Sequence, residues 1–221
     1  MKDYSVEYAA IRPANPRAIQ HNHIVSEAKM VEMFEADPCN VWLNSFGGCR
    51  SNWLAKGLKA KPHYNPQVPF YDGKGCHYIR PLDVSVDLGI FCYVEDVGVA
   101  LSCMDVKLET MWHVYEKLLP AEEYLDLKYD IGHWLDLIDK QIDNWTSNPY
   151  FPTLIINADS LADEEKYQTF KALFDLGEEF LPFRKRTTTE WMPSLQPYRR
   201  KILKMNRKLR SLPDFELRAP L

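Results

Sequence analysis

This chain of 221 residues lacks the features that mark several protein classes. Its five cysteines form no CxxC pair, and their odd number without a secretory signal favours buried, reduced thiols over a disulfide framework or a zinc ribbon. No apolar run approaches the roughly 20 residues that a helix needs to cross a bilayer, and the N-terminus has no signal-peptide core. We therefore expect a cytoplasmic protein with no membrane partner.

Metal-binding and nucleic-acid-binding patterns are also weak. His21 and His23 alternate, but no further ligands follow at the spacing of a metal site, so a polar surface segment is expected and no metal is predicted. Positive charge is concentrated in residues 184–221, which carry 11 Lys and Arg against 3 Asp and Glu. This segment either meets an anionic partner or is a solvated helix face. Its apolar stripe and the acidic remainder of the chain favour a packed closing helix and no nucleic-acid partner.

What the chain does contain is a succession of strand-like and helix-like segments around a predicted core, with an apolar fraction of 46% and an aromatic fraction of 13%. Strands are expected at 39–46, 88–94 and 153–157. Helices are expected at 27–36, 52–61, 97–107, 111–119, 122–145, 164–176 and 198–212. This alternation predicts an α/β domain over 29–221, in which helices flank a mainly parallel central sheet in three layers. Residues 1–28 are expected to form an irregular arm.

The most informative segment is 41–54, where a buried strand runs into the Gly47-Gly48 turn and then into a helix at Ser51. Unpaired backbone N–H groups and the helix dipole both favour an anion at such a turn. In parallel sheets, ligands bind beyond the carboxyl ends of the strands, where this turn lies. No Gly-Lys-[Ser/Thr] follows, so the turn is not a Walker A loop and ATP hydrolysis is not expected.

Five segments follow one another in the order found in the sulfotransferase family that uses 3′-phosphoadenosine 5′-phosphosulfate (PAPS), which the chain resembles from about residue 38 to 213. They are residues 45–54, 75–82, 93–102, 145–161 and 183–191. The resemblance implies a P-loop-like fold and transfer of a sulfuryl group from PAPS to a hydroxyl or amine of a small-molecule or glycan acceptor. Family members often dimerise, so a homodimer is implied as well.

The resemblance also implies roles for individual residues. His77 matches the general base that removes the acceptor proton, a task that suits an imidazole because its pKa lies near working pH; a structural, hydrogen-bonded histidine is the alternative. Residues 45–54 match the loop that holds the 5′-phosphosulfate. The implied donor-binding residues are Gly47, Gly48, Cys49, Arg50, Ser51, Asn52 and Trp53 at that loop, and Ser102, Arg184 and Lys185 at the 3′-phosphate.

Two departures from the family pattern bear on activity. Gly48 stands where the family has its catalytic basic residue, and Arg50 stands where it has glycine, so Arg50 is the implied substitute. Glu95 or Asp96 takes the place of the arginine that binds the 3′-phosphate, which puts an anion opposite an anion. Two interpretations remain open: an active sulfotransferase, or a catalytically inactive sulfotransferase-like fold that binds a nucleotide, an anion or a protein.

Overall fold

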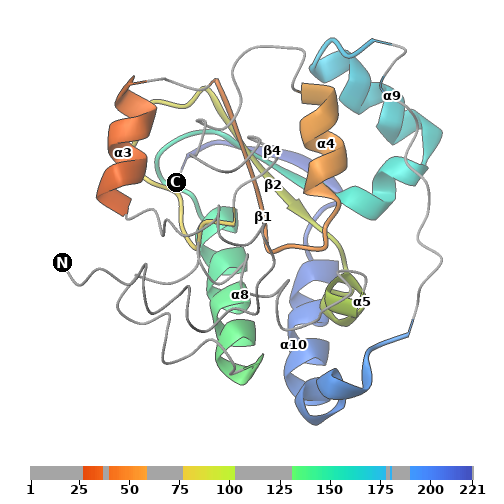
Figure 1. Cartoon of the computed structure of the whole chain (residues 1–221). Coiled ribbons are helices and arrows are strands. Elements are labelled where there is room, and N and C mark those ends of the chain that lie inside the picture. The colour runs from red at the N-terminus through yellow and green to blue at the C-terminus, as the bar shows by residue number, and fades with distance from the viewer. Residues whose placement is uncertain are drawn as a thin grey trace, which may run out of the picture.

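A computed structural model describes residues 27–36, 40–58, 77–102, 131–177, 180 and 190–220 of the chain. Within these ranges, strands alternate with helices (Figure 1). The α-helices are α3 (Glu27–Ala36), α4 (Ser51–Leu58), α5 (Val97–Ser102), α8 (Ile131–Thr146), α9 (Glu164–Leu173) and α10 (Arg199–Arg210). The strands are β1 (Val41–Ser45), β2 (Leu88–Tyr93), β3 (Thr153–Asn157) and β4 (Phe215–Arg218), and two 3-10 helices are η1 (Ala158–Ala162) and η2 (Pro193–Tyr198).

The strands of the described residues form one sheet in the order β1-β2-β3-β4. The first three are parallel, with Val41 opposite Leu88 and Gly89 opposite Thr153, and β4 runs antiparallel to β3. Every residue of β1 and β3 is buried, as is all of β2 after its first residue. Successive side chains point to opposite faces, so this burial means that both faces of the parallel strands are covered. The predicted α/β class with a mainly parallel sheet is confirmed.

The elements expected from the sequence are largely present, with shifted ends. The strands expected at 39–46, 88–94 and 153–157 are β1, β2 and β3, and the helix expected at 27–36 is α3. The antiparallel strand β4 was not predicted. The expected helix 111–119, the parts 59–61, 103–107 and 122–130 of three others, and residues 1–26 of the expected arm lie outside the described residues.

The basic C-terminal helix is a packed element, as its apolar stripe predicts. Ile202 and Leu209 on α10 are fully buried, and α10 lies beside α8 in Figure 1. Ion pairs join the two helices: Lys208 Nζ lies 2.8 Å from Asp139 Oδ1 and 2.6 Å from Asp143 Oδ1. Part of the positive charge of α10 is therefore matched by the carboxylates of α8 within the chain.

An aromatic cluster fixes α3 and α8 against the start of the sheet. The ring of Trp42, on β1, lies 4.7 Å from that of Phe34 and 5.0 Å from that of Trp145, centroid to centroid. The Trp42–Trp145 pair meets edge to face, the arrangement that the charge distribution of aromatic rings favours. These contacts place α8 directly beside the strand that leads into the Gly47-Gly48 turn.

Candidate functional site

The turn after β1 has a backbone conformation that few residues tolerate. Gly47, Gly48 and Arg50 have φ values of 88°, 64° and 59°, all in the left-handed region. A Cβ atom added to Gly48 would lie 2.3 Å from the backbone oxygen of Ala100, on α5. Position 48 therefore requires glycine both for its φ and for its contact with α5. The basic residue that the sulfotransferase resemblance expects at this position has no room here.

Hydrogen bonds within the turn hold this backbone. Ser45 Oγ donates to Ser51 Oγ over 3.1 Å and accepts from the Gly47 amide over 3.4 Å. Cys49 Sγ donates to the Gly47 carbonyl over 3.2 Å, and Cys92 Sγ donates to the Cys49 carbonyl over the same distance. Both cysteines are buried free thiols, as the sequence predicts. The Cys49 thiol thus stabilises the turn from inside.

Helix α4 begins directly after the turn and points its N-terminus toward it. The carbonyl of Arg50 accepts the amide of Trp53 over 2.8 Å, so the helix starts at Ser51. The first N–H groups of a helix have no acceptor within it and carry the positive end of its dipole. The Trp53 ring packs on Phe180 with centroids 4.4 Å apart. Trp53 is therefore a packing residue at this end of α4, and the side chain of Asn52 lies outside what the structure describes.

His77 lies against the strand that leads into this turn, although 31 residues separate it from Ser45 in the chain. Its Nδ1 atom is 2.6 Å from the backbone oxygen of Ser45 and 3.5 Å from Ser45 Oγ. A carbonyl oxygen only accepts hydrogen bonds, so Nδ1 carries the proton and the lone pair of the neutral ring is on Nε2. The structure thus brings together the two features that the sequence singled out, the histidine and the glycine turn.

The backbone next to His77 is held by three side-chain donors that the sequence analysis did not identify. The carbonyl of Tyr78 accepts Asn44 Nδ2 over 2.8 Å, Gln141 Nε2 over 2.9 Å and Trp145 Nε1 over 2.9 Å. Asn44 and Gln141 are fully buried. A polar residue inside an apolar helix stripe is the signal that could have identified Gln141, because buried polar groups are informative where buried apolar ones are not.

Ser102, the predicted 3′-phosphate ligand, joins α5 to the segment before η2. Its hydroxyl donates to the Gly98 carbonyl over 2.7 Å and accepts the Met192 amide over 2.9 Å. Phosphate oxygens need donors, and the proton of this hydroxyl is directed to Gly98. Ser102 therefore has hydrogen-bond partners within the chain, and its assignment to the 3′-phosphate stays a prediction.

Asp96, one of the two acidic residues that stand where the resemblance expects an arginine, has a structural role. Its Oδ1 atom accepts the Val99 amide over 3.1 Å at the start of α5 and Trp191 Nε1 over 3.0 Å. Trp191 also packs on α5, since a Cβ on Gly98 would lie 2.4 Å from its indole ring. The carboxylate therefore caps a helix and anchors the tryptophan that follows the basic segment. Arg184 and Lys185, in that segment, lie outside the described residues.

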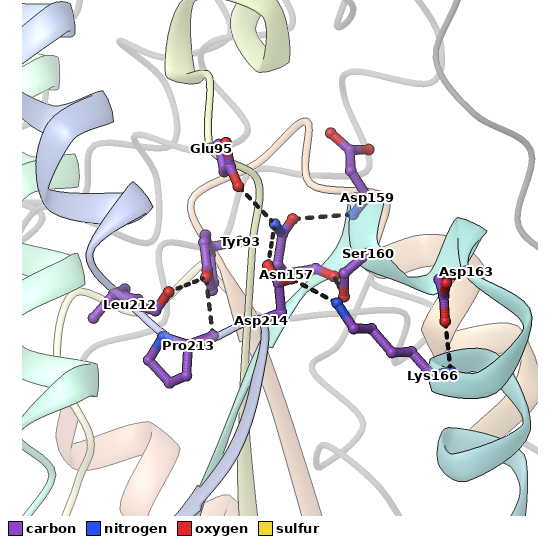
Figure 2. A network of polar contacts seen from close by, with 10 residues as sticks. All are labelled: Tyr93, Glu95, Asn157, Asp159, Ser160, Asp163, Lys166, Leu212, Pro213 and Asp214. Carbon is purple, nitrogen blue, oxygen red and sulfur yellow. Dashed lines mark hydrogen bonds and ion pairs between the residues drawn. The ribbon is translucent and has the colours of Figure 1, made fainter.

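A second polar network lies at the carboxyl end of β3 (Figure 2). Asp214 Oδ1 accepts Asn157 Nδ2 over 2.9 Å, and Asp214 Oδ2 pairs with Lys166 Nζ at 2.7 Å. The hydrogen bond from Lys166 holds the pKa of Asp214 below its usual value, with a smaller contribution from Asn157. The same bond raises the pKa of Lys166. This network ties the start of β4 to α9.

Tyr93 extends this network to the end of β2. Its hydroxyl donates to the carbonyls of Pro213, over 3.0 Å, and Leu212, over 3.3 Å. Burial raises the pKa of Tyr93, and the charges of Asp214 and Glu95 raise it further. Residues 212–214 therefore cover the carboxyl ends of β2 and β3 (Figure 2), whereas the end of β1 continues into the glycine turn.

Among the described residues, no helix is long and apolar enough to cross a membrane. Comparisons with known protein families, with curated proteins and with solved structures find no match to this chain.

Proposed function

We propose that this chain transfers a sulfuryl group from PAPS to a hydroxyl or amine acceptor. The S–O bond to the 5′-phosphate breaks, a new bond forms between sulfur and the acceptor atom, and the acceptor proton passes to Nε2 of His77. Adenosine 3′,5′-bisphosphate leaves. Positioning and charge supply most of the catalysis in such an in-line displacement.

The observation that carries this proposal is the 2.6 Å contact between His77 Nδ1 and the Ser45 carbonyl. A histidine that acts as a general base needs its lone pair directed at the substrate, and an acceptor bonded to its other nitrogen fixes the tautomer that puts the lone pair there. The Ser45 carbonyl is that acceptor, and it immediately precedes the turn and the α4 N-terminus that would bind the phosphosulfate. A histidine with this tautomer beside an anion-binding turn suits proton removal next to a transferring group.

Arg50 is the basic residue proposed to stabilise charge on the bridging oxygen. Position 48 has no room for a side chain because of the contact with Ala100. Arg50 lies two residues further on, directly before α4, and keeps its left-handed φ of 59° despite having a Cβ atom. A residue that retains an unfavourable φ is consistent with a functional constraint at that position.

A second candidate function is anion or nucleotide binding without transfer. It is favoured by Asp96 and Ser102, whose polar atoms make contacts within α5 and with residues 191–192. Because the polar atoms of Asp96 and Ser102 are engaged in these contacts, the described residues offer little attraction to a 3′-phosphate. Binding at the 5′ end of a nucleotide does not depend on them.

Calorimetric titration separates these functions. Adenosine 3′,5′-bisphosphate should bind, and the absence of binding at near-millimolar ligand would refute the proposal. Parallel titration with AMP measures what the 3′-phosphate contributes. Transfer is then assayed with radiolabelled PAPS and a panel of phenols, alcohols and amines. Nucleotide binding without transfer to any acceptor would favour the second function.

The role of His77 is tested by His77→Ala. We expect transfer to fall about 10²- to 10⁴-fold, the usual contribution of a general base, with nucleotide affinity retained. His133→Ala, on α8, is the matched control and should keep full transfer. Unchanged turnover in His77→Ala would exclude the histidine as the base.

A further inference from the structure

Gln141 on α8 is the most unusual polar residue near the proposed site. It lies on the buried stripe of the helix, between Ile138 and Ile142, and is fully buried. Its Oε1 atom finds no hydrogen-bond donor in the described part of the structure. An apolar residue at this position would avoid that unfavourable burial, so the presence of glutamine calls for an explanation.

The contacts of the side-chain amide nitrogen explain why a glutamine stands at position 141. Nε2 lies 2.9 Å from the Tyr78 carbonyl and 3.1 Å from the Ser45 carbonyl, with Asn44 Oδ1 slightly further at 3.2 Å. All three neighbours are acceptors, which fixes the orientation of the side-chain amide. Its two hydrogens therefore reach the carbonyl bonded to the His77 ring and the carbonyl of the residue that follows His77.

We propose that Gln141 is a positioning residue that sets the orientation and tautomer of the His77 imidazole. It holds the Ser45 carbonyl, the acceptor of His77 Nδ1, at a fixed distance from the backbone that carries His77. A carbonyl oxygen has two lone pairs, so the Ser45 oxygen accepts both His77 and Gln141. The functional consequence rests on the proposed transfer reaction, whereas the effect on the tautomer does not.

The alternative is that Gln141 only stabilises the fold, and the hydrogen-bond pattern separates the two roles. In Gln141→Met, the Ser45 carbonyl can still accept from His77 Nδ1, although Gln141 no longer holds it in place, and the Tyr78 carbonyl keeps Asn44 and Trp145 as donors. No buried carbonyl among these loses all its donors, and the unpartnered Oε1 is removed. Stability should therefore be close to wild type.

Asn144 provides the matched control. It lies on the same helix, and its Nδ2 atom donates over 3.0 Å to the carbonyl of Ile79, in the same segment as His77. Asn144→Leu removes a side-chain-to-backbone bond of the same kind without touching Ser45 or Tyr78. A general loosening of α8 from this segment would affect both variants, whereas loss of His77 positioning would affect only Gln141→Met.

Two measurements on the full chain test the proposal. ¹⁵N NMR of the histidine rings should show neutral His77 protonated on Nδ1 in wild type and in Asn144→Leu. In Gln141→Met it should shift toward the Nε2-protonated form that free imidazole side chains prefer. In the transfer assay, kcat of Gln141→Met should fall about 10- to 100-fold with KM unchanged, the effect of a small misplacement of a reacting group.

The outcomes are distinguishable. An unchanged tautomer and unchanged kcat in folded Gln141→Met would overturn the positioning role. So would Nε2-protonated His77 in the wild type, a result that does not depend on any variant folding. If wild type catalyses no transfer, the proposed function fails, and the NMR comparison still decides whether Gln141 sets the tautomer.

Discussion

Substitution of Gly48 tests the geometry on which the site depends. In Gly48→Ala, a residue with a Cβ must adopt a φ near 64°, which costs about 1–2 kcal/mol. Its Cβ would also lie 2.3 Å from the Ala100 oxygen, and such overpacking costs about 1–3 kcal/mol. The free energy of unfolding should therefore fall by about 2–5 kcal/mol, or roughly 5–15 °C in Tm for a chain of this size.

The overlap cannot relax easily because α5 is held from several sides. Ala100 is fully buried, the Val97 amide donates to Asn206 Oδ1 on α10 over 2.9 Å, and Asp96 caps the helix. Gly48→Lys should destabilise the chain in the same way and give no more transfer than the wild type, although it places a basic residue where the resemblance expects one. A gain of transfer in Gly48→Lys would contradict the assignment of that role to Arg50.

Urea and thermal unfolding, followed by circular dichroism, measure the effect. Gly57→Ala on α4 is the control: its Cβ would lie 2.5 Å from the Phe180 ring, a side chain rather than backbone. Alanine also favours the helix by about 1 kcal/mol over glycine, so this loss should be the smaller one. A loss below about 1 kcal/mol in Gly48→Ala would refute the left-handed, α5-packed turn.

Two further substitutions test charges. Arg50→Gly should change the free energy of unfolding by less than about 1 kcal/mol, because the relief of the left-handed φ offsets the added entropy of the unfolded chain. The affinity for adenosine 3′,5′-bisphosphate, measured by calorimetry, should nevertheless fall about tenfold. Asp214→Asn should lower the free energy of unfolding by about 1 kcal/mol near neutral pH. The loss is this small because both side chains of the Lys166–Asp214 ion pair are 40% exposed, so that water screens their attraction. The pKa of Asp214 is lowered on folding, so the wild-type advantage exists above the usual carboxyl range and disappears as pH falls through the folded pKa. A pH-independent difference in urea titrations would contradict this.

The parallel core of the fold was predictable because burial leaves a plain signal in the sequence. Strands β1 and β3 are buried at every position, and each contains an apolar run, 41–43 and 154–156, that polar or turn residues bound on both sides. Strand β4 carries no such signal. Its four residues, Phe215–Arg218, are all at least partly exposed and include Glu216 and Arg218. Its pairing with β3 is decided by tertiary contacts, which a local pattern does not contain.

The candidate site was predictable only in part, for a similar reason. The glycine turn and His77 stand out because their residue types are informative on their own. The contacts of Gln141 join residues separated by 96 positions for Ser45 and 63 for Tyr78. Gln141 interrupts the apolar stripe of α8, but nothing in the local sequence indicates which carbonyls it reaches. Which carbonyls Gln141 reaches depends on how α8 lies against β1, and the aromatic contact of Trp42 with Trp145 sets that arrangement.

Contacts within the chain explain why acidic residues stand at positions 95 and 96, where the resemblance expects an arginine. Asp96 accepts N–H groups from Val99 and Trp191, and Glu95 Oε2 lies 3.6 Å from Arg210 Nε. An arginine at position 96 could accept neither N–H group, because a guanidinium has no acceptor atom. The carboxylate therefore holds α5 and residue 191 together within the chain. The affinity of any nucleotide should then depend mainly on its 5′ end, at the glycine turn and the N-terminus of α4.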